Sequence, residues 1–179
     1  MKKYSIKNEI IELKNLDPNF LDQDYVSWLN EPTVNQYLES RFIRWTDLSL
    51  KEYVIKANSD DSTLLFGIFL LSADKLIGTI KLSLINQYHK TAEIGLLIGD
   101  KTQWGKGIAT AAIKLITKFS FQQLRLHKIT AGAYANNKGS IKAFQKNGFL
   151  IEGIIKEQYH LNGITVDKII LGLINKQDI

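Results

Sequence analysis

The chain has 179 residues, of which 45% are hydrophobic and 23% are charged, so it can bury the core of an ordinary globular domain. With 23 Lys and Arg against 18 Asp and Glu, its net charge is +5; this excess suits an anionic ligand, and no basic run or arginine cluster favours nucleic acid as a partner. The absence of cysteine excludes disulfides, thiol nucleophiles and thiolate metal sites.

The N-terminal residues Met1-Lys2-Lys3-Tyr4-Ser5 are basic, but they lead into mixed polar residues without the apolar core of a signal peptide. No apolar run approaches the roughly 20 residues of a membrane span. The sequence therefore predicts a single domain over residues 1–179, located in the cytoplasm and without a membrane partner.

The first third of the chain predicts one strand followed by two or three helices. Residues 9–16 are strand-like, and Asp17-Pro18-Asn19 breaks their pattern. Helical spacing then predicts a helix up to Asn30, a helical segment over 31–42 and a helix capped by Thr46 or Asp47. The expected buried positions are Phe20, Tyr25, Trp28 and Leu29, then Val34, Tyr37 and Leu38, then Leu48, Leu50, Tyr53, Val54 and Ala57. The aromatic residues among them are either core residues or the lining of an acceptor pocket.

After a polar break at 58–62 the hydrophobic period changes from helical to two, which is typical of half-buried strands. One strand is predicted over 64–71, and an antiparallel hairpin follows, with strands over 78–84 and 92–98 around the polar loop 86–90. The positions expected on one face are Gly78, Ile80, Leu82 and Leu84, then Ala92, Ile94, Leu96 and Ile98.

The last third predicts a helix to about Gln122, a strand over 128–135 and a short helix capped by Asn136 or Asn137 and ended by Gly148. The first helix should bury Ile108, Ala112, Ile113, Leu115, Ile116 and Phe119, and the second Ile141 and Phe144. Two long strands, 149–161 and 164–174, are joined by Asn162-Gly163, a strong hairpin signal.

This order of elements predicts an α+β (mixed α/β) fold, with a mostly antiparallel, twisted sheet of about seven strands flanked by four to five helices. The strand–helix–strand unit around residues 105–107 implies a right-handed crossover and one parallel strand pair. If these two parallel strands diverge, they leave a cleft that suits an extended cofactor.

The residues Trp104-Gly105-Lys106-Gly107-Ile108-Ala109 stand where a strand changes into a helix. Two glycines there allow backbone N–H groups to turn outward at a helix N-terminus, which carries positive partial charge and suits a phosphate. The pattern matches neither a P-loop nor a Rossmann fingerprint. An anion-binding turn and a plain tight turn are both consistent with these residues alone.

The segments "AEIGLLIG", "QWGKGIAT", "NNKGSIKAFQKNGF" and "IEG", together with the order of elements, resemble the Gcn5-related N-acetyltransferases (GNAT) over roughly residues 9–174. Within them the chain most resembles the branch of the Rim-type ribosomal-protein N-terminal acetyltransferases, and "WLNEPTVNQYLESRF" also resembles amino-sugar acetyltransferases. The resemblance implies acetyl-CoA as cosubstrate and an amine as acceptor. The residues themselves, with no cysteine and no His-x-x-x-His spacing, predict no metal.

The resemblance also assigns residues to the cofactor. The pyrophosphate would lie on the N–H groups of the glycine turn, the pantetheine arm along the preceding strand, and Asn137 against that arm while it also caps its helix. The implied cofactor-binding residues are Leu96, Leu97, Ile98, Trp104, Gly105, Lys106, Gly107, Ile108, Ala109, Thr110, Asn137, Ser140 and Phe144. Trp104 stands where the family often has Arg or Gln.

For catalysis, the amine must lose a proton before it attacks the thioester. Glu93, on the strand that should hold the acetyl group, is the first candidate for this base, and a solvent-facing strand carboxylate is the alternative reading. Tyr159 is a further catalytic candidate, with Glu157 and His160 in reserve. Many family members have a tyrosine at the position of Phe144 that can protonate the departing thiolate, so Ser140 or solvent would have to replace it.

Two further sets of residues could belong to a site. The histidines at 89, 127 and 160 have no metal-ligand spacing. Arg41, Arg44 and Arg125 could serve an anionic acceptor, although ordinary surface arginines are the simpler reading.

The function that follows is acetyl-CoA-dependent N-acetylation by direct attack in a ternary complex. The acceptor would be a protein N-terminus, a small amine or an amino sugar nucleotide, and the enzyme a monomer or homodimer. The alternative, motivated by Phe144, is a non-catalytic CoA-binding or regulatory module on the same scaffold, and nucleic-acid binding from the +5 charge is a weaker third.

Overall fold

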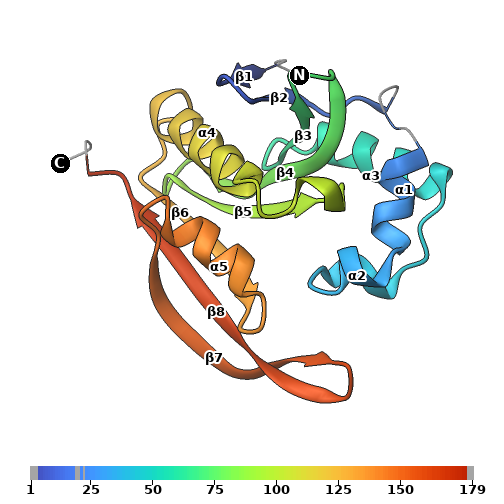
Figure 1. Cartoon of the computed structure of the whole chain (residues 1–179). Coiled ribbons are helices and arrows are strands. Elements are labelled where there is room, and N and C mark those ends of the chain that lie inside the picture. The colour runs from blue at the N-terminus through green and yellow to red at the C-terminus, as the bar shows by residue number, and fades with distance from the viewer. Residues whose placement is uncertain (1–3, 19–20, 22, 177–179) are drawn as a thin grey trace.

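The computed structural model describes residues 4–18, 21 and 23–176, and Phe20 of the first predicted helical stripe lies outside them. Figure 1 shows the arrangement of the elements. The strands are β1 (Ser5–Lys7), β2 (Ile11–Asn15), β3 (Leu64–Leu70), β4 (Lys75–Asn86), β5 (Thr91–Ile98), β6 (Lys128–Tyr134), β7 (Leu150–Leu161) and β8 (Ile164–Ile174). The helices are α1 (Gln23–Asn30), α2 (Pro32–Asn35), α3 (Asp47–Ser59), α4 (Ile108–Gln122) and α5 (Lys138–Gln145), with 3₁₀ turns η2 (Glu39–Phe42) and η3 (Lys101–Gln103).

The strands of the described chain form one eight-stranded sheet in the order β1-β2-β3-β4-β5-β6-β8-β7. Every neighbouring pair is antiparallel except β5 and β6, which are parallel and joined by the α4 crossover. The predicted mostly antiparallel sheet with one parallel pair is confirmed. The additional strand is β1, which has only three residues, too few for a periodic pattern.

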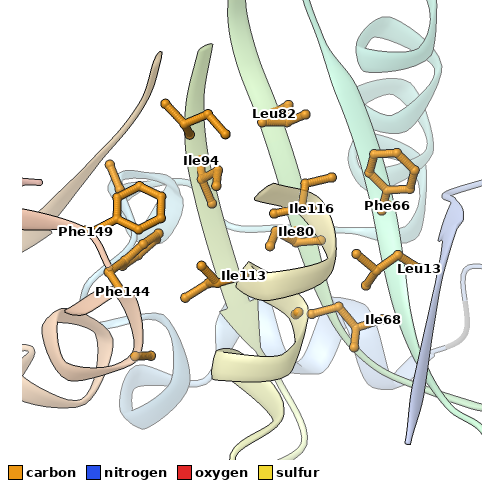
Figure 2. Packing of buried hydrophobic residues seen from close by; sticks show 14 of the residues in the cluster. Leu13, Phe66, Ile68, Ile80, Leu82, Ile94, Ile113, Ile116, Phe144 and Phe149 are labelled. Atoms are coloured by element: carbon orange, nitrogen blue, oxygen red, sulfur yellow. The ribbon is translucent and has the colours of Figure 1, made fainter. Parts of the chain in front are cut away.

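Two layers of helices cover the two faces of the sheet (Figure 1). On one face, Ile113 and Ile116 of α4 pack on Ile80, Leu82 and Ile94 of the central strands, as Figure 2 shows, and α5 adds its apolar side to the same cluster. On the other face, α1 and α3 bury a second cluster against β3, β4 and β5; its aromatic members are Tyr25, Trp28, Trp45 and Phe69. Because side chains alternate across a strand, each central strand contributes to both clusters.

The parallel strands β5 and β6 separate partway along their length. Their paired residues run from Thr91 and Lys128 only as far as Ile94 and Ala131. Beyond that point β5 continues to Ile98 while paired with β4, and β6 continues to Tyr134 while paired with β8. The predicted divergence is therefore present, and it leaves one edge of β5 without a neighbouring strand.

Two predicted core positions are wrong. Leu48 is 67% exposed, because the inward face of α3 is formed by Leu50, Val54 and Ala57 instead. Leu84 is 69% exposed with a φ of 53°, because the β4–β5 pairing is irregular between Ser83 and Asn86 and interrupts the alternation there. None of the described helices has the length and apolar character that crossing a bilayer requires.

Candidate functional site

A cleft of about 860 Å³ opens where β5 and β6 separate. It runs from the aromatic residues of α1–α3, past the free edge of β5, to the first turns of α4 and α5. The sequence-predicted residues that line it are Glu93, Leu96, Leu97, Ile98, Trp104, Gly105, Gly107, Ile108, Ala109, Thr110, Asn137, Ser140 and Phe144. Lys106 and Tyr159 are not among the lining residues. The structure therefore gathers most of the predicted site in one place.

The glycine turn has the backbone conformation that its sequence requires. Gly105 and Gly107 have φ values of 74° and 81°, a left-handed region that glycine adopts without the steric cost other residues incur. A Cβ atom built on either residue would meet no other atom within 4 Å. Both glycines therefore face open space at the cleft, and a side chain at either position would project into that space.

The N-terminus of α4 has no side-chain cap. Gly107 is the N-cap residue, and the first helical bond runs from the Ala111 N–H to the Gly107 carbonyl at 2.9 Å. The N–H groups of Ile108, Ala109 and Thr110 therefore have no acceptor within the helix. Three aligned donors and the positive end of the helix dipole form a site for an anion, such as a phosphate.

The free edge of β5 presents backbone groups to the cleft in alternation. The Gly99 N–H donates to the Ile77 carbonyl of β4 at 3.0 Å, so the N–H of Leu97, two residues earlier, also points toward β4. Those of Leu96 and Ile98 then point away from β4, toward the cleft. The Trp104 indole N–H already donates to the Ile98 carbonyl at 2.8 Å, so the backbone of Leu96 is the more accessible point for a strand-like ligand.

The N-terminus of α5 forms the opposite wall of the cleft. The Asn137 side-chain oxygen accepts from the Ser140 backbone N–H at 3.1 Å, which confirms the predicted helix cap. The cap uses the oxygen of Asn137 and the backbone of Ser140, so the Asn137 amide nitrogen and the Ser140 hydroxyl are not consumed by it. Phe144 is 2% exposed and packs edge-to-face on Phe149, with ring centroids 5.0 Å apart. Phe144 thus supplies an apolar wall and no proton.

Glu93 faces the α1–α3 side of the sheet. It is half-buried, stands opposite Ser83 of β4 and Thr130 of β6, and points away from its buried neighbours Ala92 and Ile94, as the alternation predicts. The described residues include no ion-pair partner for its carboxylate. The structure therefore places one carboxylate on the cleft wall without an ion-pair partner among the described residues.

The end of the cleft beside α1–α3, called the acceptor side below, contains a hydrogen-bond network that the sequence does not predict. Tyr134, at the end of β6, donates from its hydroxyl to Glu39 and accepts from Arg41, both at 2.6 Å. Arg41 also donates to the His160 carbonyl at 2.9 Å. The side chain of Arg41 is 13% exposed, so the interpretation of this residue as an ordinary surface arginine is wrong. No local pattern indicates a contact between residues 93 positions apart.

Tyr159 stacks on Tyr134 with ring centroids 3.8 Å apart. Burial raises the pKa of Tyr159 to about 12, and the negative charge of Glu39 adds to the effect. Its hydroxyl is therefore protonated near neutral pH and is a poor base. Glu157 and the His160 side chain are exposed and do not line the cleft. Within residues 4–18, 21 and 23–176, no three His, Asp or Glu side chains are grouped as metal ligands.

The sequence of this chain is similar to those of known proteins. Residues 11–150 match the family model of the acetyltransferase (GNAT) domain. The chain is 41% identical over 114 residues to the probable N-acetyltransferase YjcK of Bacillus subtilis, a match that covers 63% of this chain and 62% of that protein. It is 26% identical over 154 residues to the acetyltransferase PseH of Campylobacter jejuni, covering 85% and 92%.

The fold is also that of solved acetyltransferases. The spermidine N-acetyltransferase of Vibrio cholerae, in complex with CoA and spermine, superimposes with a TM-score of 0.83 at 25% identity, covering 93% of this chain and 96% of that one. The RimJ protein of Mycobacterium smegmatis, in complex with CoA-disulfide, has the same fold, with a TM-score of 0.79 at 17% identity and coverage of 98% and 88%. The chain therefore belongs to the acetyltransferase (GNAT) family and is an N-acetyltransferase.

Proposed function

We propose that this enzyme transfers an acetyl group from acetyl-CoA to a primary amine by direct attack in a ternary complex. The observation that carries the proposal is one continuous cleft that joins the uncapped N-terminus of α4 to the carboxylate of Glu93. An anion site at one end and a proton acceptor at the other are the two groups that such a transfer needs.

The residues of the cleft fit acetyl-CoA. The N–H groups of residues 108–110 suit its pyrophosphate, and the backbone of Leu96 offers strand-like hydrogen bonds to its amide-containing arm. The amide nitrogen of Asn137 lies on the opposite wall. The related enzyme from Vibrio cholerae is described in complex with CoA, which supports this assignment.

The chain's own residues would then orient the reactants and move protons. The bound cosubstrate supplies an activated acetyl thioester. Glu93 accepts the proton of the amine, directly or through water, so that the nitrogen lone pair can form the new C–N bond. The Ser140 hydroxyl donates a proton to the departing sulfur and is itself reprotonated from solvent. Phe144 and its apolar neighbours limit water around the thioester.

The acceptor is proposed at the level of a primary amine. A small amine, a protein N-terminus and an amino sugar nucleotide all present the nucleophile that this geometry needs. Relatives support the class: one is named a spermidine N(1)-acetyltransferase, and another a putative ribosomal N-acetyltransferase. The acceptor side of the cleft, lined by Tyr25, Tyr37 and Tyr53, has room for a small organic molecule beside Glu93.

An acceptor screen tests the proposal. Purified enzyme is mixed with acetyl-CoA and each member of a panel of polyamines, amino sugars, amino acids and short peptides, and thiol release is followed with a thiol reagent. Turnover with at least one primary amine is the expected result. Tight CoA binding without release for any amine would instead support the non-catalytic module that Phe144 suggests.

A further inference from the structure

The acceptor side of the cleft also holds a cationic side chain, Lys81 of β4. Lys81 lies on the α1–α3 face of the sheet, because its neighbours Ile80 and Leu82 belong to the core on the opposite, α4 face. Lys81 is half-buried and lines the cleft, with its ammonium group 5.8 Å from the ring centroid of Tyr53. The ammonium group is therefore held over an aromatic ring inside the cleft.

Among the described residues, Lys81 has no carboxylate partner. The ion pairs among the described residues do not include it, and they do not include Glu93. Glu39, the other carboxylate on this side of the cleft, accepts from Tyr134 and lies 4.0 Å from Arg41. Within the described part of the chain, Lys81 and Glu93 are thus a cation and an anion on the acceptor side that form no ion pair.

The spacing of these two charges follows from the strand register. Lys81 stands opposite Gly95, and Ser83 stands opposite Glu93, so Lys81 and Glu93 are diagonal neighbours on one face. The backbones of diagonal positions of this kind lie about 7–8 Å apart, so both side chains rise from neighbouring points of the same face. Gly95 has no side chain between them, and a Cβ there would meet nothing within 4 Å. The space above Gly95 can hold a small molecule that reaches both charges.

We propose that the acceptor is a small amine that also carries an anionic group, and that Lys81 is the residue that selects it. This inference rests on the proposed function, because it places the acceptor's amine at Glu93. The anionic group, a phosphate or a carboxylate, lies against the Lys81 ammonium, where burial and Tyr53 strengthen a charge-assisted hydrogen bond. A polyamine carries only positive charge and is repelled by Lys81.

Matched acceptors test the inference. Glucosamine is compared with glucosamine 6-phosphate, glycinamide with glycine, and spermidine serves as the cationic acceptor. The wild-type enzyme is expected to show a kcat/KM at least about tenfold higher for the anionic member of one pair, as one charge-assisted hydrogen bond provides. The pair that shows the preference distinguishes a phosphate from a carboxylate.

The Lys81→Met variant, which keeps the apolar stem, should lose this preference through a higher KM for the anionic acceptor, with little change for the neutral one. Lys114→Met, an exposed position on α4, is the control and should behave as the wild type. Unchanged CoA affinity in both variants shows that the fold is intact.

Three results would overturn the inference. The first is equal use of both members of both pairs, and the second is spermidine as the preferred acceptor; either leaves the proposed acetyl transfer standing. The third is an equal loss of kcat/KM with all acceptors in Lys81→Met. Absence of thiol release with every amine would refute the proposed function itself, and this inference with it.

Discussion

The sequence predicts two glutamates, Glu93 and Glu157, as candidates for the catalytic base. The structure places only one of them in the cleft. Glu93 lines the cleft, whereas Glu157 is exposed at an irregular part of β7, where its N–H donates to Asp167. Replacement of Glu93 by Gln preserves shape and removes the proton acceptor. We expect Glu93→Gln to lower kcat/KM about 100-fold or more near pH 7.

The pH dependence sharpens this prediction. At alkaline pH the amine loses its proton without help, so the deficit of Glu93→Gln should shrink in a pH–rate profile. Glu157→Gln is the matched control and should show wild-type rates throughout. A deficit that is equal at pH 7 and pH 9.5 would exclude Glu93 as the base.

Ser140 has a structural contact and a proposed chemical role, and the two can be measured apart. Its backbone N–H is held by the Asn137 cap, so Ser140→Ala should leave the free energy of unfolding within about 0.5 kcal/mol of wild type. Loss of its hydroxyl should lower kcat about tenfold or more if that hydroxyl protonates the thiolate. Asn137→Ala, in contrast, should cost about 1 kcal/mol of stability, because the helix cap is lost. Unchanged kcat in Ser140→Ala would assign the proton to solvent.

At the scale of elements, Arg41 of η2 connects the helical layer to the sheet through hydrogen bonds. Its guanidinium donates to Tyr134 of β6, to the His160 carbonyl of β7 and to the Leu38 carbonyl. We expect Arg41→Met to lower the free energy of unfolding by about 1–3 kcal/mol, as expected for the loss of partly buried, charge-assisted hydrogen bonds. Urea denaturation measures this value.

Arg44→Met provides the comparison for Arg41→Met, because Arg44 is exposed and has the same side-chain chemistry. Its effect should stay within about 0.5 kcal/mol of zero. Equal destabilisation by the two substitutions would show that the contacts of Arg41 with β6 and β7 contribute nothing specific.

The elements also show what the sequence can and cannot predict. The alternating residues of β5 and the helical stripe of α4 indicate their elements because one face of each is buried. The glycine turn and the cap at Asn137 are local signals, and both are found where they were predicted. Leu84 was misplaced because a bulge is not visible in hydrophobic periodicity. The contacts of Arg41 and the position of Lys81 beside Tyr53 come from distant residues and strand register, which depend on the whole sheet.

At the scale of the whole molecule, buried phenols limit stability in alkali. Burial raises the pKa of Tyr159 to about 12 and also raises that of Tyr25, from an ordinary value of 10.0. The folded state therefore holds these protons more tightly than the unfolded state does. The stability linked to them is complete below pH 10 and is lost as the pH rises toward 12.

Urea unfolding between pH 8 and pH 11.5 tests this prediction. The free energy of unfolding should fall above pH 10, and Tyr159→Phe should make that fall shallower. Tyr88→Phe, at a position that is 97% exposed, should leave the fall unchanged. A slope in Tyr159→Phe identical to that of wild type would show that the Tyr159 phenol has the same pKa in both states.

The molecule as a whole is two helical layers around a sheet that opens at one point, and the opening brings an anion site, a free strand edge and a carboxylate together. Each of these features comes from a different part of the chain, and their coincidence in one cleft supports the proposed acetyl transfer. The part most directly open to measurement is the glycine turn, since its two glycines have left-handed backbones and face open space.

Calorimetric titration of CoA into the Gly107→Val and Gly163→Val variants measures how much the glycine turn contributes to CoA affinity. Gly163, in the β7–β8 turn, has the same φ of 81° and the same open surroundings, so the two substitutions share the backbone strain. Only the side chain at position 107 enters the cleft. The account predicts a dissociation constant for CoA at least about tenfold higher in Gly107→Val and unchanged in Gly163→Val, equivalent to losing one charge-assisted hydrogen bond. Equal CoA affinity in the two variants would contradict a pyrophosphate site at the start of α4.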